Sequence, residues 1–231
     1  MYSLKDKNVL QELKSDNAQA FDTVERMKHQ RKTEISGITH DLRNSVSVIH
    51  SALQVGAMKN PELLNNPMWN NATQNTKEMI DFLNRISKYR YSDEINPSPV
   101  GVCEFLNKLS SDCNGYISIE NECAPTDTIN ADCDKLSYAF CEIISNAKDA
   151  DCSISLCAYT KKNSVCFMFT TYGGSMDEEE LSGAFEPFFS RKKDHHGLGL
   201  SIALSTVTAH NGTINISNMF DDLITEVCLY S

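Results

Sequence analysis

The sequence predicts an α+β chain in which an N-terminal helical hairpin is followed by an α/β sandwich. Apolar residues recur every three or four positions over 33–91, which is the spacing of amphipathic helices. A polar stretch with two prolines at 92–100 then marks a linker. Beyond it, helical patterns and β-rich runs occupy separate segments, an arrangement typical of helices packed on one face of an antiparallel sheet.

Composition excludes several classes of protein. The 231 residues carry a net charge of −10, which argues against a nucleic-acid partner because such proteins use basic surfaces to neutralise phosphates. No apolar run approaches the length needed to span a bilayer, and no N-terminal stretch resembles a signal peptide. We therefore expect a cytoplasmic protein without membrane insertion.

The nine cysteines are interpreted as free thiols. Their number is odd, no secretion signal precedes them, and no C-x-x-C pair with finger-spaced histidines occurs, so neither a disulfide framework nor a zinc site is expected. We expect most of them to be buried as small apolar side chains.

The first helices are predicted from their apolar stripes. Residues 1–32 form a helical lead-in, and helices are expected over about 33–59 and 67–91, joined by a connection rich in asparagine and proline. The first stripe comprises Ile35, Ile38, Leu42, Val46, Ile49 and Leu53. The second comprises Met68, Ala72, Met79, Leu83 and Ile86. Two such helices bury only part of their apolar faces, which favours pairing with a second copy as a homodimer.

His40 lies outside the first stripe, so its imidazole is expected to face solvent, with Asp41, Arg43 and Asn44 close by along the helix. The string HDLRN resembles the phospho-accepting helix of two-component sensor histidine kinases, H-[DE]-x-R-[NT]; Ser45 follows where proline is usual. The resemblance implies a dimeric four-helix bundle with His40 as phosphoacceptor. It also implies that Asp41 orients the ring and that Asn44 positions a water for dephosphorylating a response regulator.

The segment after the linker is expected to begin with a short helix and a strand. A longer helix, a β-hairpin, a polar glycine-containing stretch, another helix and two final strands follow. The expected positions are 102–113, 115–123, 130–151, 153–160, 164–171, 201–211, 212–217 and 224–230.

Three polar residues share one face of the helix at 130–151. Glu142, Asn146 and Asp149 are one turn apart, and carboxylate and amide oxygens suit a hydrated Mg²⁺ ion. The segment is similar to the N box of the ATPase superfamily that joins histidine kinases, DNA gyrase and a heat-shock chaperone. The resemblance implies ATP as substrate and Mg²⁺ ligation by Glu142 and Asn146. Glu142 stands where most histidine kinases have asparagine, so it is either a metal ligand or a base.

Two further motifs follow in the family's order. EPFFSRK resembles the F box, and its Lys192 is within reach of phosphates in this interpretation. HHGLGLSIA resembles the G2 box, with Gly197, Leu198 and Gly199 directly before a helix. Glycines at a helix N-terminus let the backbone approach a phosphate, whose charge the helix dipole favours.

The G1 box departs from the family. The pattern D-x-G-x-G reads here from Thr171 through Gly173 to Ser175, so the aspartate that accepts a hydrogen bond from the adenine amino group is missing. Loss of a buried acceptor costs about 1–3 kcal/mol, or roughly tenfold to a hundredfold in affinity. Thr171 is expected to accept the bond more weakly.

The resemblance covers residues 33–231. It implies a phosphotransfer hairpin at 33–91, the linker at 92–100 and an ATPase domain of the same superfamily at 101–231. The leading interpretation is a histidine kinase that autophosphorylates His40 and passes the phosphoryl group to a receiver domain, with a separate protein as a possible sensor. Two alternatives stay open. One is a dimeric histidine phosphotransferase whose C-terminal domain no longer binds ATP, and the other is a non-catalytic scaffold that binds kinases.

Overall fold

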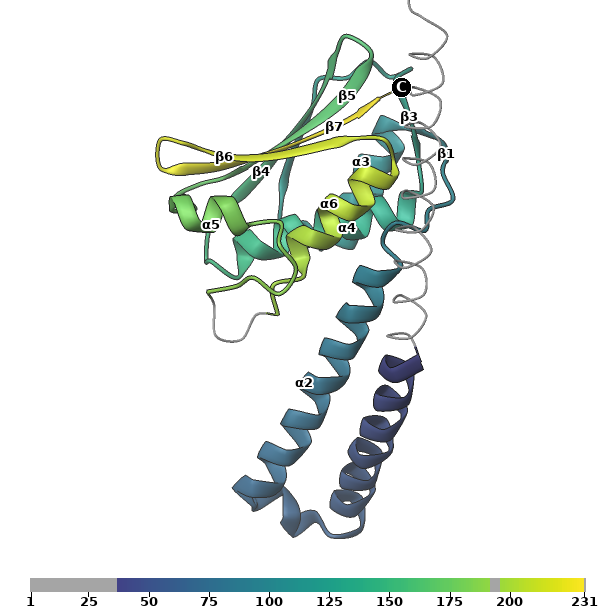
Figure 1. Ribbon diagram of the computed structural model, residues 1–231, viewed down its shortest axis with the longest axis vertical. Coiled ribbons are helices and arrows are strands. Elements are labelled where there is room, and N and C mark those ends of the chain that lie inside the picture. Colours follow the sequence, from purple (N-terminus) through teal and green to yellow (C-terminus); the bar gives the residue numbers. More distant parts are fainter. Residues whose placement is uncertain (1–36, 192–195, 231) are drawn as a thin grey trace, which may run out of the picture. The chain divides into compact units, whose positions relative to one another are not determined.

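The computed structural model describes residues 37–191 and 196–230, which divide into two compact units between Ser87 and Lys88 (Figure 1). The predicted lead-in at 1–32 lies outside the described residues. Among those described, no helix is both long enough and apolar enough to cross a membrane. The fold class is confirmed: a helical region precedes an α/β sandwich.

The first unit is a helical hairpin. A helix over residues 37–59 is followed by η1 (Pro61–Asn65) and α2 (Pro67–Arg90). Asn66 begins α2, because its side-chain oxygen accepts a hydrogen bond from the backbone N–H of Met68 at 2.9 Å. Val46 and Leu83 are buried between the helices, and a Cβ at Gly56 would lie 2.8 Å from the Trp69 ring.

The predicted apolar stripes do not all face inward within one chain. Val46 is buried, whereas Ile38 is 62% exposed and Leu42 and Ile49 are about half exposed. Thr39 is buried instead, so the inward face is rotated from the predicted stripe. The apolar side chains left at the surface of this hairpin include Ile38, Leu42, Val48, Ile49, Val55, Met58, Met68 and Met79.

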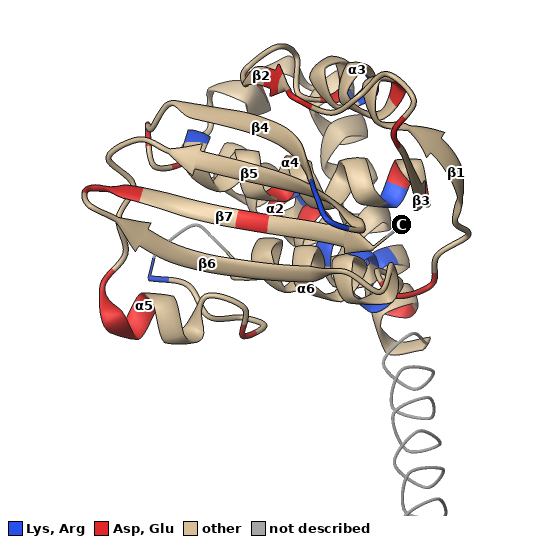
Figure 2. Cartoon of the chain, turned by 90° about the horizontal axis from the view of Figure 1, so that it is seen from above, with Lys and Arg blue, Asp and Glu red and all other residues tan. Residues whose placement is uncertain are grey.

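The second unit is built on a five-stranded sheet with the order β2-β4-β5-β7-β6. Its strands are β2 (Ser118–Asn121), β4 (Ile154–Lys161), β5 (Ser164–Thr171), β6 (Thr213–Met219) and β7 (Asp222–Tyr230). Its helices are α3 (Val102–Asp112), α4 (Cys133–Lys148), α5 (Glu178–Gly183) and α6 (Gly199–Ala209). Figure 2 shows α3, α4 and α6 on one face of this sheet.

The core lies between that face and the helices. Val165, Phe167 and Phe169 alternate along β5 and are buried, as the period of two along a strand requires. Phe140 of α4 meets the rings of Phe167 and Phe169 edge to face, each at 5.1 Å between centroids. These contacts hold α4 against the sheet.

Three features differ from the sequence-based expectations. Residues 98–100 of the expected linker belong to β1 (Ser98–Gly101), which pairs with β3 (Thr128–Ala131). Because β3 runs to Ala131, α4 starts later than expected, after its N-cap Asp132. Strand β2 runs parallel to β4, so the sheet is not wholly antiparallel.

The expectation that all nine cysteines are free and mostly buried is wrong. Cys166 of β5 and Cys228 of β7 form a disulfide, because the strand register places them directly opposite one another with their Cα atoms 4.1 Å apart. Of the seven remaining thiols, Cys123 alone is buried, and Cys103 is exposed.

Candidate functional site

The polar side chains of α4 meet the N-terminus of α6. A Cβ at Gly199, the first residue of α6, would lie 2.9 Å from Glu142 Oε2 and 3.5 Å from Asn146 Oδ1. Glu142 is only 5% exposed, so its carboxylate is held in the protein interior. The arrangement brings one carboxylate and one amide together beneath the backbone N–H groups of a helix N-terminus. Such a cradle suits an anion accompanied by a cation.

The turn before α6 depends on glycine. Gly197 has φ +62°, and a Cβ there would lie 2.4 Å from the backbone oxygen of Phe189. The backbone N–H of Phe188 donates a hydrogen bond to the Gly197 oxygen at 2.8 Å. Leu198 is fully buried and anchors the start of α6, because its oxygen accepts bonds from Ile202 N and Ser201 Oγ.

The end of β5 contributes a second loop. Thr171, its last residue, is 7% exposed, and its methyl group lies against Gly174, where a Cβ would be 2.6 Å away. Gly173 has φ +70°, and its N–H donates to Asp222 Oδ1 at 2.9 Å. The loop after β5 is thus tied to the start of β7.

Two further site residues were predicted from the sequence, Asp149 and Lys192. Asp149 is exposed at the C-cap of α4, where its carboxylate accepts a hydrogen bond from Ser145 Oγ at 3.4 Å. Lys192 lies outside the described residues. Among the residues described, no group of three or more His, Cys, Asp and Glu side chains is arranged to hold a metal ion.

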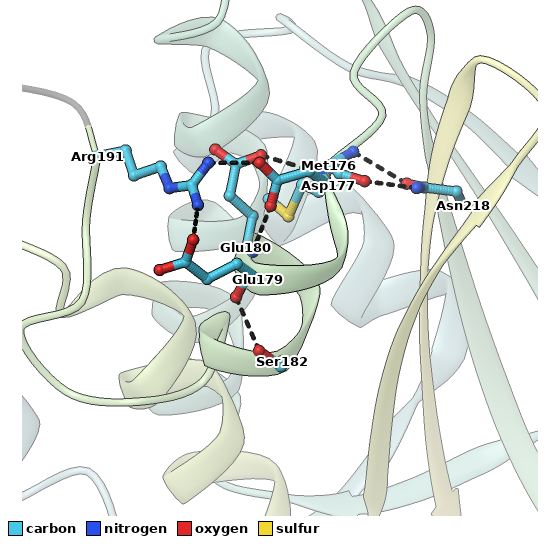
Figure 3. A network of polar contacts seen from close by, with 7 residues as sticks. All are labelled: Met176, Asp177, Glu179, Glu180, Ser182, Arg191 and Asn218. Carbon is cyan, nitrogen blue, oxygen red and sulfur yellow. Dashed lines mark hydrogen bonds and ion pairs between the residues drawn. The ribbon is translucent and has the colours of Figure 1, made fainter.

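An ion-pair network that the sequence interpretation missed holds α5 (Figure 3). Arg191 pairs with Asp177, the N-cap of α5, and with Glu179 in its first turn. The hydrogen bond that the Glu180 backbone N–H donates to the Asp177 carboxylate lowers the pKa of Asp177 below its usual range. The positive charge of Arg191 lowers this pKa further. Asn218 of β6 bonds both backbone groups of Met176 and so fixes the approach to α5.

A local signal for this element was present in the sequence. An aspartate followed three residues later by glutamate is the capping-box pattern, and Asp177 and Glu180 form that reciprocal pair of hydrogen bonds. The partners Arg191 and Asn218 come from elsewhere in the chain, so that pattern did not indicate them.

In the first unit, His40 is exposed on its helix with two polar neighbours at the same ring nitrogen. Asp41 Oδ1 lies 3.4 Å from His40 Nδ1, and Asn44 Nδ2 lies 3.3 Å from it. Nδ1 donates to Asp41 only when it carries the ring proton, and accepts from Asn44 only when it does not. The Asp41 contact favours the tautomer that leaves the Nε2 lone pair available, and the Asn44 contact favours the opposite tautomer.

Comparisons with known proteins agree with this architecture. Residues 131–226 match the family described as "Histidine kinase-, DNA gyrase B-, and HSP90-like ATPase". Sporulation kinase B of Bacillus subtilis (strain 168) is 23% identical over 202 residues, a match spanning 80% of this chain and 46% of that protein. The histidine-protein kinase BaeS of Escherichia coli (strain K12) is 25% identical over 227 residues, spanning 89% and 48%. The chain thus spans about half the length of these two relatives.

Among solved structures, the histidine kinase ThkA in complex with the response regulator protein TrrA superposes with a TM-score of 0.59. The match has 17% identity and covers 89% of this chain and 64% of that one. At this identity the likeness concerns the fold.

In the second unit, α4 and α6 bring a carboxylate, an amide and a glycine turn together, and the match to the ATPase family spans these residues. The family match over residues 131–226 and the similarity to histidine kinases over most of the chain support a two-component sensor histidine kinase. The phosphotransfer role of residues 33–91 stays a prediction from the HDLRN motif.

Proposed function

We propose that this protein is a kinase that transfers the γ-phosphoryl group of ATP to His40 and then to an aspartate of a response-regulator receiver domain. The observation that carries the proposal is the convergence of Glu142 and Asn146 on Gly199 at the N-terminus of α6. The family match at residues 131–226 supports a nucleoside triphosphate as the ligand of this site.

The chemistry of the donor set fits Mg²⁺. Glu142 and Asn146 would supply oxygen ligands, and Mg²⁺ in phosphate sites is usually bound by one or two protein groups while phosphates and waters complete its shell. When bound, the ion neutralises charge on the phosphates. Buried Glu142 next to Gly199 would otherwise repel the phosphates, which is a second reason to expect a cation between them.

The chain's own residues would act as follows. Asp41 accepts a hydrogen bond from the protonated Nδ1 of His40. The Nε2 lone pair is then available to attack the γ-phosphorus. The bond between that phosphorus and the β–γ bridging oxygen breaks, and ADP departs with the electron pair. Asn44, one helical turn from His40, is placed to orient a water during dephosphorylation of the regulator.

We further propose a homodimer in the cytoplasm. The apolar side chains left exposed on the hairpin, among them Ile38, Leu42 and Ile49, lie beside the buried face of the same helix. A second copy that packs against them would complete a four-helix bundle. ThkA, whose fold this chain shares, has been solved with a response regulator, which supports a receiver domain as the partner.

One observation favours a second candidate, a dimeric histidine phosphotransferase that relays phosphate without binding ATP. The buried residue at the end of β5 is Thr171 rather than an aspartate, so the usual charged acceptor for the adenine amino group is missing.

Two measurements decide between these functions. Calorimetric titration with a non-hydrolysable ATP analogue and Mg²⁺ is expected to show saturable binding that Glu142→Gln weakens. Labelled ATP is then expected to label the wild type and His40→Gln to remove the label. His50→Gln is the matched control, because His50 lies on the same helix but bonds Thr76 at 2.9 Å. Absence of nucleotide binding up to millimolar concentration would refute the kinase and leave the phosphotransferase.

A further inference from the structure

Two free cysteines in the second unit are nearly in covalent contact. Cys113 is the C-cap of α3, Cys141 lies in α4, and their Sγ atoms are 2.8 Å apart. A disulfide has an S–S distance of about 2.05 Å. A shift of less than about 1 Å would therefore bring these two sulfurs to bonding distance.

The pair is also accessible, because both residues are partly exposed, whereas Cys123 is buried. The neighbouring residues Asn114 and Gly115 both adopt positive φ, so Cys113 sits at the start of a tight turn rather than within a rigid helix. A side chain in that position can approach Cys141 without unwinding α3, which ends one residue earlier at Asp112.

The two thiols differ in acidity. Either sulfur can donate in this contact, and a hydrogen bond from the S–H of Cys141 lowers the pKa of Cys113. The same bond, together with burial, raises the pKa of Cys141, which keeps its proton. The negative charge of Asp112 raises the pKa of Cys113. The Asp112 carboxylate, however, accepts a hydrogen bond from Ser137 Oγ at 2.6 Å and forms an ion pair with Lys108 at 3.2 Å. Cys113 is the more nucleophilic member of the pair, because the thiolate is the reactive form.

We propose that Cys113 and Cys141 form an oxidisable dithiol that a hydroperoxide converts into a disulfide between α3 and α4. The Cys113 thiolate attacks one peroxide oxygen, the O–O bond breaks, and a sulfenic acid forms, while the departing hydroxide (or alkoxide) takes a proton from solvent to become water (or an alcohol). The Cys141 sulfur then attacks the Cys113 sulfur, its proton leaves with the hydroxide as a second water, and the S–S bond forms. The two thiols lose two electrons and the peroxide gains them.

The position of the bond gives the modification a consequence. Cys141 directly precedes Glu142 in α4, so the disulfide would restrain the helix next to the carboxylate that faces Gly199. Hydrogen exchange of α4 amides is therefore expected to slow in the oxidised form, and a thiol reductant is expected to reverse the change.

The test uses the full chain, treated with stoichiometric hydrogen peroxide and digested without reduction. Mass spectrometry is expected to find a peptide joined through Cys113 and Cys141 and a loss of two titratable thiols. In Cys141→Ser, a dimedone adduct is expected at Cys113, because its sulfenic acid has no partner. Cys103→Ser is the matched control, since it removes an exposed thiol of α3 and is expected to leave the cross-link unchanged.

The proposal would be overturned if peroxide produced a cross-link other than Cys113–Cys141, the Cys166–Cys228 disulfide being present before treatment. Oxidation of Cys103 or Cys152 ahead of Cys113, or thiol loss that Cys113→Ser does not alter, would also overturn it. The wild-type peptide map decides by itself if a serine variant fails to fold. None of these readouts depends on nucleotide binding, so they are independent of the proposed kinase activity.

Discussion

Replacing Thr171 with aspartate restores a charged acceptor at the end of β5. The side chain is 7% exposed, so a hydrogen bond formed there is shielded from water. A bond to a charged group contributes about 1.5–3 kcal/mol, against about 0.5–1.5 kcal/mol for a neutral one. The difference of about 1–2 kcal/mol predicts that Thr171→Asp binds an ATP analogue roughly five- to thirtyfold more tightly than the wild type.

Calorimetric titration with ATP and GTP analogues and Mg²⁺ measures this effect. A hydroxyl can donate or accept, whereas an ionised carboxylate only accepts, so Thr171→Asp is also expected to raise the preference for the adenine amino group over the guanine carbonyl. Thr171→Val is the matched control, because it keeps the side-chain shape and removes the hydroxyl. It is expected to weaken ATP binding by about 0.5–1.5 kcal/mol.

Thr171→Asp is also expected to lower the stability of the nucleotide-free protein. A buried carboxylate without a partner destabilises the fold, so the unfolding temperature of Thr171→Asp should fall without nucleotide and recover when the analogue is added. A folded Thr171→Asp variant whose ATP affinity and ATP-to-GTP preference equal those of the wild type would refute the assignment of this position to base recognition.

Three substitutions in the second unit give further predictions. Gly199→Ala places a Cβ 2.9 Å from Glu142 Oε2, so nucleotide affinity should fall on the order of tenfold in the same titration while the unfolding temperature changes little. Asp132→Ala removes the N-cap of α4 and should cost about 1 kcal/mol in thermal unfolding at pH 7. Although burial opposes it, bonds from backbone N–H groups lower the pKa of Asp132 in the folded state. Its stabilisation is therefore complete above about pH 4 and is lost as the pH falls, so the variant and the wild type should converge in acid; a constant difference would contradict this. Arg191→Ala should change the free energy of unfolding by less than about 1 kcal/mol, since its pairs with Asp177 and Glu179 are exposed, and a larger or salt-independent loss would contradict that view.

Local patterns predicted most of the secondary structure. Apolar residues alternate along β5 and recur periodically along α4, because each element buries one side. Both patterns can be recognised from residues that are close in the sequence. Strand β1 and helix α5 were not predicted from the sequence, because both are short. β1 lies in a proline-containing segment and exists through pairing with β3, and α5 has six residues whose cap is completed by contacts from other elements.

The hairpin shows where periodicity is insufficient. The spacing of Ile38, Leu42, Val46 and Ile49 places them on one side of a helix, yet only Val46 is buried within the chain. Which part of an apolar surface turns toward α2 depends on the packing of particular side chains, such as Trp69 against Gly56. In a helix with a wide apolar surface, the spacing of apolar residues does not determine which part of that surface faces the neighbouring helix.

The sequence by itself determined the fold class, the order of the motifs and the identity of His40, Glu142, Asn146 and Thr171, because these depend on residue type and local spacing. Tertiary structure decided which of them meet. Gly199 lies far from Glu142 along the chain and reaches it only because α4 and α6 pack on the same face of the sheet. The Cys166–Cys228 disulfide likewise depends on strand register, and the contact of Cys113 with Cys141 depends on the packing of α3 against α4. Such contacts arise from the summed burial of many distant residues, which no local pattern encodes.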